Sequence, residues 1–238
     1  ISNHIDGLSQ YILNVVLAWE LTKGYHYTLL VRPNECPELY LRLYNKKGIH
    51  IEEVDIAPIG PLRDIQFARY LRSHRHFDAA FIPSNQFPLA LRIPALYKIH
   101  DLIYEQFPEQ LGHLSWLKRW YLRLVTRVGL KRAQQVVAVS QYTRDQILRY
   151  HGSHFENKLR VIYEGWEHLL FFANETCGYP KDIPFSKYIL YVGSSRGHKN
   201  WGRLIQAIQR ASHQLPPDWG FVFIGSTKML SKKHLQLV

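Results

Sequence analysis

Cysteine is scarce in this sequence of 238 residues, since Cys36 and Cys177 are the only two. Two cysteines are too few for a disulfide framework or a cysteine zinc site, so the composition favours a reducing cytoplasm. Long apolar runs are missing as well, because no stretch approaches the roughly 18–20 apolar residues that a membrane-spanning helix needs. We identify no signal peptide, low-complexity tract or internal repeat. With 46% apolar residues, the chain is expected to form a soluble globular protein.

Acidic residues are few compared with basic ones: 19 against 30, for a net charge of +11. The imbalance is greatest in residues 176–238, which hold 9 basic and 2 acidic residues. Such an excess suits nucleic acid, an anionic membrane or a phosphorylated ligand, and it is also compatible with a fragment of unbalanced charge. Neither a helix-turn-helix nor an interleaved basic and aromatic motif is present, so no nucleic-acid partner is expected.

Short apolar runs alternate with helical patterns along the chain. Short apolar runs divided by helices are typical of parallel sheets covered on both faces, so we predict the α/β class. The expected helices are residues 7–20, 37–47, 61–73, 116–132, 141–150 and 201–211. The expected strands are residues 27–31, 49–54, 79–82, 95–100, 135–139, 159–162, 188–192 and 221–225.

The alternation stops between Gly165 and Ser186, where prolines and glycines occur without periodicity. This composition suits a linker. We therefore expect an N-terminal Rossmann-like domain over residues 1–165, a linker over 166–187, and the start of a second, incomplete domain over 188–238.

The loop from Gly193 to Asn200 joins a predicted strand to a predicted helix. Open α/β sheets bind ligands at such positions, and a helix start offers free N–H groups to anions. Arg196 and Lys199 add positive charge. The loop therefore suits a phosphate or diphosphate, although a solvated basic helix start explains it equally well. It has neither Walker spacing nor a Gly-x-Gly-x-x-Gly fingerprint, which disfavours a Rossmann dehydrogenase.

His100 and Asp101 follow another predicted strand directly. A histidine there can exchange a proton or bind a sugar hydroxyl, while the alternative is a structural histidine whose neighbour Asp101 caps the next segment. The close histidine pairs elsewhere have no third ligand nearby, so no metal site is expected.

Four motifs, in order and spacing, resemble glycosyltransferase family 4. They lie at Ile99–Ile103 with Gln106–Glu109, Lys131–Ser140 with Tyr142–Thr143, Lys158–Ile162, and Tyr188–Gly193 with His198–Asn200 and Arg203–Ile205. The resemblance implies the GT-B architecture, with two Rossmann-like domains that have parallel sheets. It also implies a mannosyltransferase-like enzyme of polysaccharide biosynthesis that transfers a hexose from a nucleotide-diphosphate sugar to a saccharide or lipid-linked acceptor with retention.

The same resemblance assigns roles to individual residues. His100, with Asp101, matches the catalytic cleft position near the transferred sugar. Lys199 matches the basic residue on the donor diphosphate, and the donor loop further includes Gly193, Ser194, Arg196 and Asn200. Gly7 and Ser9 match the family's first glycine loop, in which Ser9 replaces a frequent second glycine.

No cofactor or metal is expected beyond the sugar nucleotide, because the sequence has no Asp-x-Asp, the usual carboxylate signature for a metal-bound sugar nucleotide. The alternative function is an inactive GT-B-like fragment that serves only as a binding or interaction module.

The helix predicted over residues 116–132 carries two stripes. One is apolar and is expected to cover the sheet, and the other is cationic with i, i+4 spacing. With Trp116 and Trp120, the cationic stripe suits peripheral contact with an anionic membrane at its inner face, and a solvated basic face is the alternative. The apolar stripe comprises Leu117, Tyr121, Leu124 and Val128, and the cationic stripe Arg119, Arg123, Arg127 and Lys131.

Overall fold

The computed structural model describes residues 7–19, 24–33, 46–57, 59–74, 76–111, 115–165, 183–193, 199–216 and 218–224. The chain divides into two compact units, residues 1–170 and 171–238. We describe each unit by itself.

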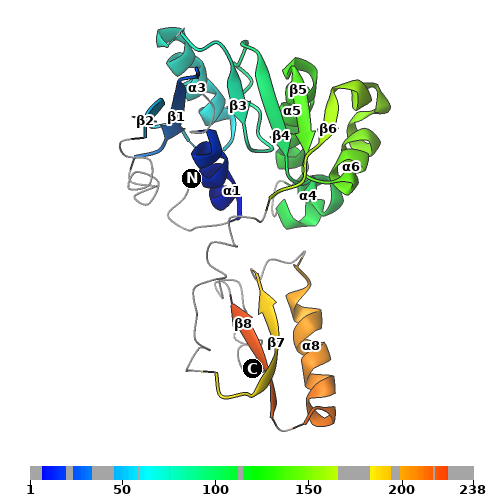
Figure 1. Cartoon of the computed structure of the whole chain (residues 1–238). Coiled ribbons are helices and arrows are strands. Elements are labelled where there is room, and N and C mark those ends of the chain that lie inside the picture. The colour runs from blue at the N-terminus through cyan, green and yellow to red at the C-terminus, as the bar shows by residue number, and fades with distance from the viewer. Residues whose placement is uncertain are drawn as a thin grey trace. The chain divides into compact units, whose positions relative to one another are not determined.

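Unit 1 alternates strands with helices (Figure 1). Its elements are α1 (Gly7–Trp19), β1 (Tyr27–Val31), β2 (Ile49–Glu53), α3 (Pro61–Ser73), β3 (Ala80–Ile82), β4 (Ala95–Ile99), α4 (Ile103–Gln106), the 3-10 helix η1 (Pro108–Leu111), α5 (Ser115–Arg132), β5 (Gln135–Ala138), α6 (Gln141–His151), the 3-10 helix η2 (Ser153–Lys158) and β6 (Leu159–Val161).

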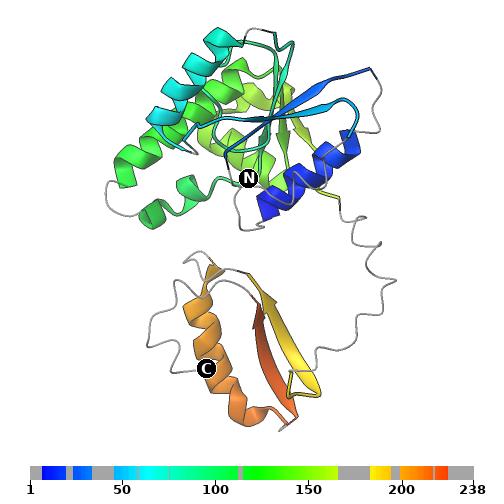
Figure 2. The ribbon, with the colours of Figure 1, turned by 90° about the vertical axis from the view of Figure 1, so that its left-hand side faces the viewer.

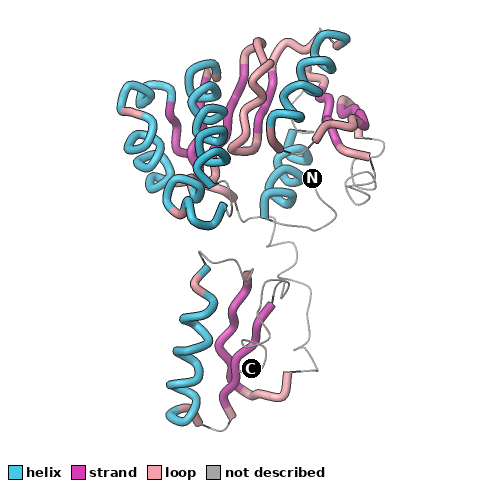
Figure 3. The backbone as a smooth tube through the Cα atoms, turned by 180° about the vertical axis from the view of Figure 1, so that it is seen from behind, coloured by secondary structure: helices cyan, strands magenta, loops and turns pink. Residues whose placement is uncertain are grey.

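The described strands of unit 1 form two parallel sheets. β1 pairs with β2, and the larger sheet has the order β3-β4-β5-β6. Helices lie along these strands, as the view from behind shows (Figure 3). The predicted α/β class with parallel sheets is confirmed.

The core of unit 1 is built on β4 and β5, which are buried over most of their length. Tyr97 and Ile99 of β4 pack with Val136 of β5 and with Leu130 of α5. Gly129 lets α5 approach this core closely, because a Cβ atom there would lie only 2.6 Å from the Tyr97 ring.

Local signals set the ends of several helices. Pro61 opens α3, where its missing N–H costs no hydrogen bond. Ser140 caps α6 by accepting a hydrogen bond from the Thr143 N–H at 3.1 Å. Gly152, with φ of 113°, ends the same helix in a conformation that side chains disfavour.

Unit 2 contains one β-α-β element within its described residues. It consists of β7 (Lys187–Val192), α8 (Trp201–Ala211), the 3-10 helix η5 (Ser212–Gln214) and β8 (Trp219–Ile224). β7 and β8 pair in parallel, and α8 lies alongside them (Figure 2). Trp201 at the start of α8 packs edge-on against Tyr191 and Phe223, with ring centroids 4.8 Å apart in both pairs.

The predicted elements that fall on described residues agree with the structure to within two residues at each end, with one exception. The helix predicted over residues 37–47 lies mostly outside the described residues, and its last two positions, Lys46 and Lys47, are not helical. The short helices α4, η1 and η2 were not predicted, because each is too short to show a helical period.

Candidate active site

The predicted pair His100 and Asp101 follows β4 directly, at the carboxyl end of the larger sheet. Because β4 and β6 run parallel in this sheet, the segment after β6 begins at the same edge, and Glu164 of that segment contacts His100. Tyr11 of α1 packs edge-on against the His100 ring, with centroids 5.2 Å apart. Together with Lys98, these side chains form what we call the His100 cluster: Tyr11, Lys98, His100 and Glu164.

His100 is held through both its ring and its backbone. Nδ1 lies 3.0 Å from Oε1 of Glu164, and Nε2 lies 3.0 Å from the carbonyl oxygen of Pro83. The backbone N–H of His100 donates to Oδ1 of Asn85 at 3.0 Å, and its carbonyl accepts from the Thr143 hydroxyl at 3.2 Å. These contacts fix the position of the ring at the sheet edge.

The protonation of His100 is linked to these contacts. Burial lowers the pKa of His100 below its usual 6.5, while the Glu164 carboxylate opposes this effect and Lys98 adds to it. One ring nitrogen faces the Pro83 carbonyl oxygen and the other faces Glu164 Oε1. When Glu164 is ionised, both of these oxygens are hydrogen-bond acceptors and neither can donate. An imidazolium satisfies both oxygens, whereas a neutral ring satisfies one.

Lys98 is the most unusual member of the cluster, because it is a lysine only 2% exposed, next to the last residue of β4. Its Nζ lies 3.5 Å from the centre of the Tyr11 ring and 3.4 Å from Oε1 of Glu164. Burial lowers the pKa of Lys98, and Glu164 opposes that change. Burial also raises the pKa of Tyr11 to about 12, so its phenol stays neutral at physiological pH.

Asp101 makes hydrogen bonds with Asn85 and with the chain that follows it. The amide of Asn85 donates to the Asp101 carbonyl at 2.8 Å and to Oδ1 at 3.2 Å. The same Oδ1 accepts from the N–H of Ile103, the first residue of α4, at 3.3 Å. These contacts fit the capping role that the sequence left open for Asp101, and its catalytic role beside His100 stays a prediction.

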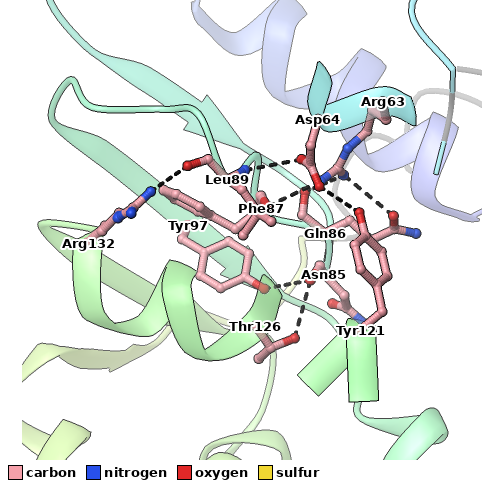
Figure 4. A network of polar contacts seen from close by, with 10 residues as sticks. All are labelled: Arg63, Asp64, Asn85, Gln86, Phe87, Leu89, Tyr97, Tyr121, Thr126 and Arg132. Atoms are coloured by element: carbon pink, nitrogen blue, oxygen red, sulfur yellow. Dashed lines mark hydrogen bonds and ion pairs between the residues drawn. The ribbon is translucent and has the colours of Figure 1, made fainter. Parts of the chain in front are cut away.

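A buried polar network holds the loop after β3 that carries Asn85 (Figure 4). The Tyr97 hydroxyl donates to the Asn85 carbonyl at 2.6 Å. Asp64 of α3 accepts from the Leu89 N–H at 3.1 Å and from the Tyr121 hydroxyl at 2.7 Å. Through Asn85, this network positions the backbone on both sides of the His100–Asp101 bond.

The buried face of α5 differs from the predicted one. Leu117 is 44% exposed and Leu124 is exposed too, whereas Val125 and Leu130 are buried. The prediction of a sheet-covering stripe at Leu117, Tyr121, Leu124 and Val128 was therefore wrong for its first and third members. The sequence places apolar residues on both sides of this helix, so the helical period alone does not show which side faces the sheet.

The predicted cationic stripe is divided by a carboxylate. Glu105 of α4 has a fully buried side chain, and Arg119 and Arg123 both pair with it, at 2.9 Å and 3.3 Å. The side chains of Arg119 and Arg123 remain 35% and 43% exposed beside this carboxylate, so these two cations still face solvent in part while their charge is paired. Arg127 and Lys131 are exposed. The stripe is split because a residue outside α5 supplies the counter-charge.

The predicted donor-binding residues that the structure describes belong to unit 2. Gly193 follows β7, and its N–H donates to the Ile224 carbonyl at 2.9 Å. Lys199 and Asn200 are exposed at the start of α8, where Asn200 adopts a left-handed conformation with φ of 56°. Ser194 and Arg196 lie outside the described residues.

The predicted glycine loop opens a helix. Gly7 is the first residue of α1, and Ser9 lies in the first turn of that helix. The same helix carries Tyr11, whose ring packs against His100.

Neither a metal cluster nor a membrane-spanning helix is found in the part of the chain that the structure describes. There, no three or more His, Cys, Asp or Glu side chains gather closely enough to hold a metal ion. Similarly, no helix among the same residues is long and apolar enough to cross a membrane.

Parallel strands alternating with helices define a Rossmann-type fold, a class in which ligands bind at the carboxyl ends of the strands. The family model for Glycosyltransferase Family 4 matches residues 5–168, which include every member of the His100 cluster. The chain therefore belongs to glycosyltransferase family 4. Membership of this family implies a glycosyltransferase, which uses a nucleotide-sugar donor and an acceptor as substrates. No curated protein matches the chain in a sequence search.

Sequence reasoning did not select Lys98, Glu164 or Tyr11 as site residues. Lys98 carried a signal, since a lysine within an otherwise apolar buried strand is rare. Tyr11 and Glu164 lie in segments that resemble the family, but only the packing of α1 and the order of the strands bring these two side chains to His100.

Proposed function

We propose that the protein transfers a hexose from a nucleotide-diphosphate sugar to a saccharide or lipid-linked acceptor. The observation that carries this proposal is the His100 cluster, a fixed imidazole beside a half-exposed carboxylate, within the region that matches the family. In this scheme His100 positions the transferred sugar, and retention of configuration and independence from metal follow from the family resemblance and from the absence of Asp-x-Asp.

Donor binding is assigned to the loop from Gly193 to Asn200. The departing diphosphate gains negative charge, which fixed cations and helix N–H groups stabilise. Lys199 supplies the cation, and the start of α8 supplies the N–H groups. Residues 1–165 then form the acceptor-side domain, residues 188–238 belong to the donor domain, and residues 166–187 link them.

The exposed side of α5 favours a lipid-linked acceptor that lies in a membrane. Trp116 and Trp120 are 70% and 60% exposed, and Leu117 and Leu124 lie on the same side of the helix. We call these four residues the aromatic face of α5. Such side chains suit the interface of a bilayer, and the exposed cations further along α5 suit its anionic lipids. The protein would then work at the cytoplasmic surface of a membrane.

Transfer from a panel of nucleotide sugars to lipid and saccharide acceptors tests the proposal. His100→Ala should lower kcat more than it weakens donor binding, because a contact that strengthens in the transition state acts on turnover. Lys199→Ala should weaken donor binding in calorimetry by about 1.5–3 kcal/mol, the contribution of a charged hydrogen bond.

Lys187→Ala is the matched control, since Lys187 is an exposed lysine of the same unit whose ion pair is with Asp218. Wild-type turnover in His100→Ala, or unchanged donor affinity in Lys199→Ala, would refute the corresponding role. The absence of transfer from every donor would refute the function.

A further inference from the structure

The burial of Lys98 is not explained by stability. Removing an ammonium group from water is costly, and replacing a buried ion pair by apolar residues of similar volume is often neutral or stabilising. The neighbours of Lys98 in β4, Tyr97 and Ile99, are fully buried. A methionine at this position would continue the apolar strand, so the lysine has a use other than packing.

Lys98 holds one carboxylate. Within the described ranges, Glu164 is the only acidic residue at ion-pair distance from Lys98, 3.4 Å from Oε1 to Nζ. The Tyr11 ring covers the same ammonium group at 3.5 Å, which restricts where Nζ can lie. The buried cation therefore fixes a carboxylate whose own side chain remains 45% exposed.

Of the two carboxylate oxygens of Glu164, Oε1 contacts other members of the His100 cluster and Oε2 does not. Oε1 faces both Lys98 and His100 Nδ1. No described residue donates a hydrogen bond to Oε2. The Glu164 side chain is 45% exposed and its Oε1 lies 3.0 Å from His100 Nδ1, so Oε2 can accept from the hydroxyl groups of a sugar.

We propose that Glu164, held in place by Lys98, is a further sugar-contacting residue beside His100, and that Lys98 is its positioning residue. This inference rests on the proposed function for the identity of the ligand as a hexose. Glu164 accepts from sugar hydroxyls, while His100 Nδ1 can exchange its contact with Glu164 for one with the sugar. Lys98 stays paired with Oε1 throughout and keeps the carboxylate at the sheet edge.

The first test needs no transfer activity. Methyl hexosides of glucose, mannose and galactose are titrated at millimolar concentration while the imidazole signals of His100 are followed by NMR. At least one hexoside should shift these signals in the wild-type chain, and Glu164→Gln should abolish the shift. No shift with any hexoside, or an equal shift in Glu164→Gln, would overturn the assignment of Glu164.

A second test separates positioning by Lys98 from a structural role. Lys98→Met should leave the melting temperature unchanged or raise it, because it removes a buried charge from an apolar strand and leaves a carboxylate that is 45% exposed to water. It should weaken the hexoside response at least tenfold, because the charged contact that holds the carboxylate in place is lost. The pKa of His100 should rise in this variant and fall in Glu164→Gln, since the first removes a like charge and the second an opposite one. A lower melting temperature with an unchanged hexoside response would show a structural lysine and overturn the proposal.

Glu156→Gln is the matched control, because Glu156 is an exposed carboxylate paired with Arg144 at the other end of β6. It should change neither the hexoside response nor the titration of His100. A loss of transfer from every nucleotide sugar combined with a hexoside response that depends on Glu164 would refute the proposed function while keeping the sugar site.

Discussion

Acid should destabilise unit 1 through His151, the last residue of α6. Its ring is 2% exposed, and within the described part of the chain neither ring nitrogen has a hydrogen-bond partner. Burial, followed by the charges of Arg123 and Arg127, lowers the pKa of His151 from 6.5 to about 4. The unfolded chain therefore binds this proton at a higher pH than the folded protein does. The contribution to stability is fully present above pH 6.5 and is lost as the pH falls toward 4.

The size of this loss follows from the two pKa values. One pH unit corresponds to about 1.4 kcal/mol, so the interval between the pKa values of 6.5 and 4 amounts to about 3.5 kcal/mol. A domain of this kind has about 5–15 kcal/mol of stability in total, so the loss is a large fraction. Urea denaturation followed by circular dichroism at pH 7.5 and pH 4.5 measures most of it.

His151→Leu isolates the contribution of this ring from that of the carboxylates. Leucine has a similar volume, and because the histidine nitrogens make no hydrogen bonds with any described residue, the substitution removes none of those that the structure describes. The loss of unfolding free energy between pH 7.5 and pH 4.5 should be about 2–3 kcal/mol smaller in this variant than in the wild type. His154→Gln, at an exposed histidine in η2, is the control and should behave as the wild type. Equal losses in His151→Leu and the wild type would refute the reasoning.

Two further predictions concern packing and the membrane. Gly129→Ala should destabilise unit 1 by about 1–3 kcal/mol, because the new Cβ would meet Tyr97 at 2.6 Å and Phe87 at 2.7 Å; an unchanged melting temperature would contradict this close approach. Replacing Trp116 and Trp120 together by serine should weaken sedimentation with anionic vesicles by about tenfold per tryptophan, whereas equal binding by both proteins, or none by the wild type, would leave the aromatic face without a lipid partner.

The sequence predicts most of the fold of unit 1 because the information is local. Strands such as Ala95–Ile99 and helices such as Pro61–Ser73 show their period within a few residues, and their bounds agree with the structure. His100 could be selected as a candidate for the same reason, since it follows a strand immediately.

The remaining features depend on contacts between distant segments. The pairing of Glu105 with Arg119 and Arg123 requires α4 to pack against α5, and nothing in the spacing of the arginines indicates a buried partner. The role of Glu164 likewise depends on the strand order, which places the segment after β6 near the end of β4. Hydrophobic periodicity reports which residues share a side of an element, and it does not report what that side meets.

The parallel pairing of the strands has a consequence for how the chain folds during synthesis. No two described strands pair through a tight hairpin; instead Leu96 pairs with Gln135, and Val136 pairs with Leu159. Each pairing can form only after the crossover segment between the two strands has been synthesised. Such non-local contacts slow folding, and the edges of the strands stay unpaired until they form. β4 therefore leaves the ribosome well before its neighbour β5, and the Lys98–Glu164 ion pair cannot form until Glu164 has emerged. The His100 cluster is accordingly among the last parts of unit 1 to assemble.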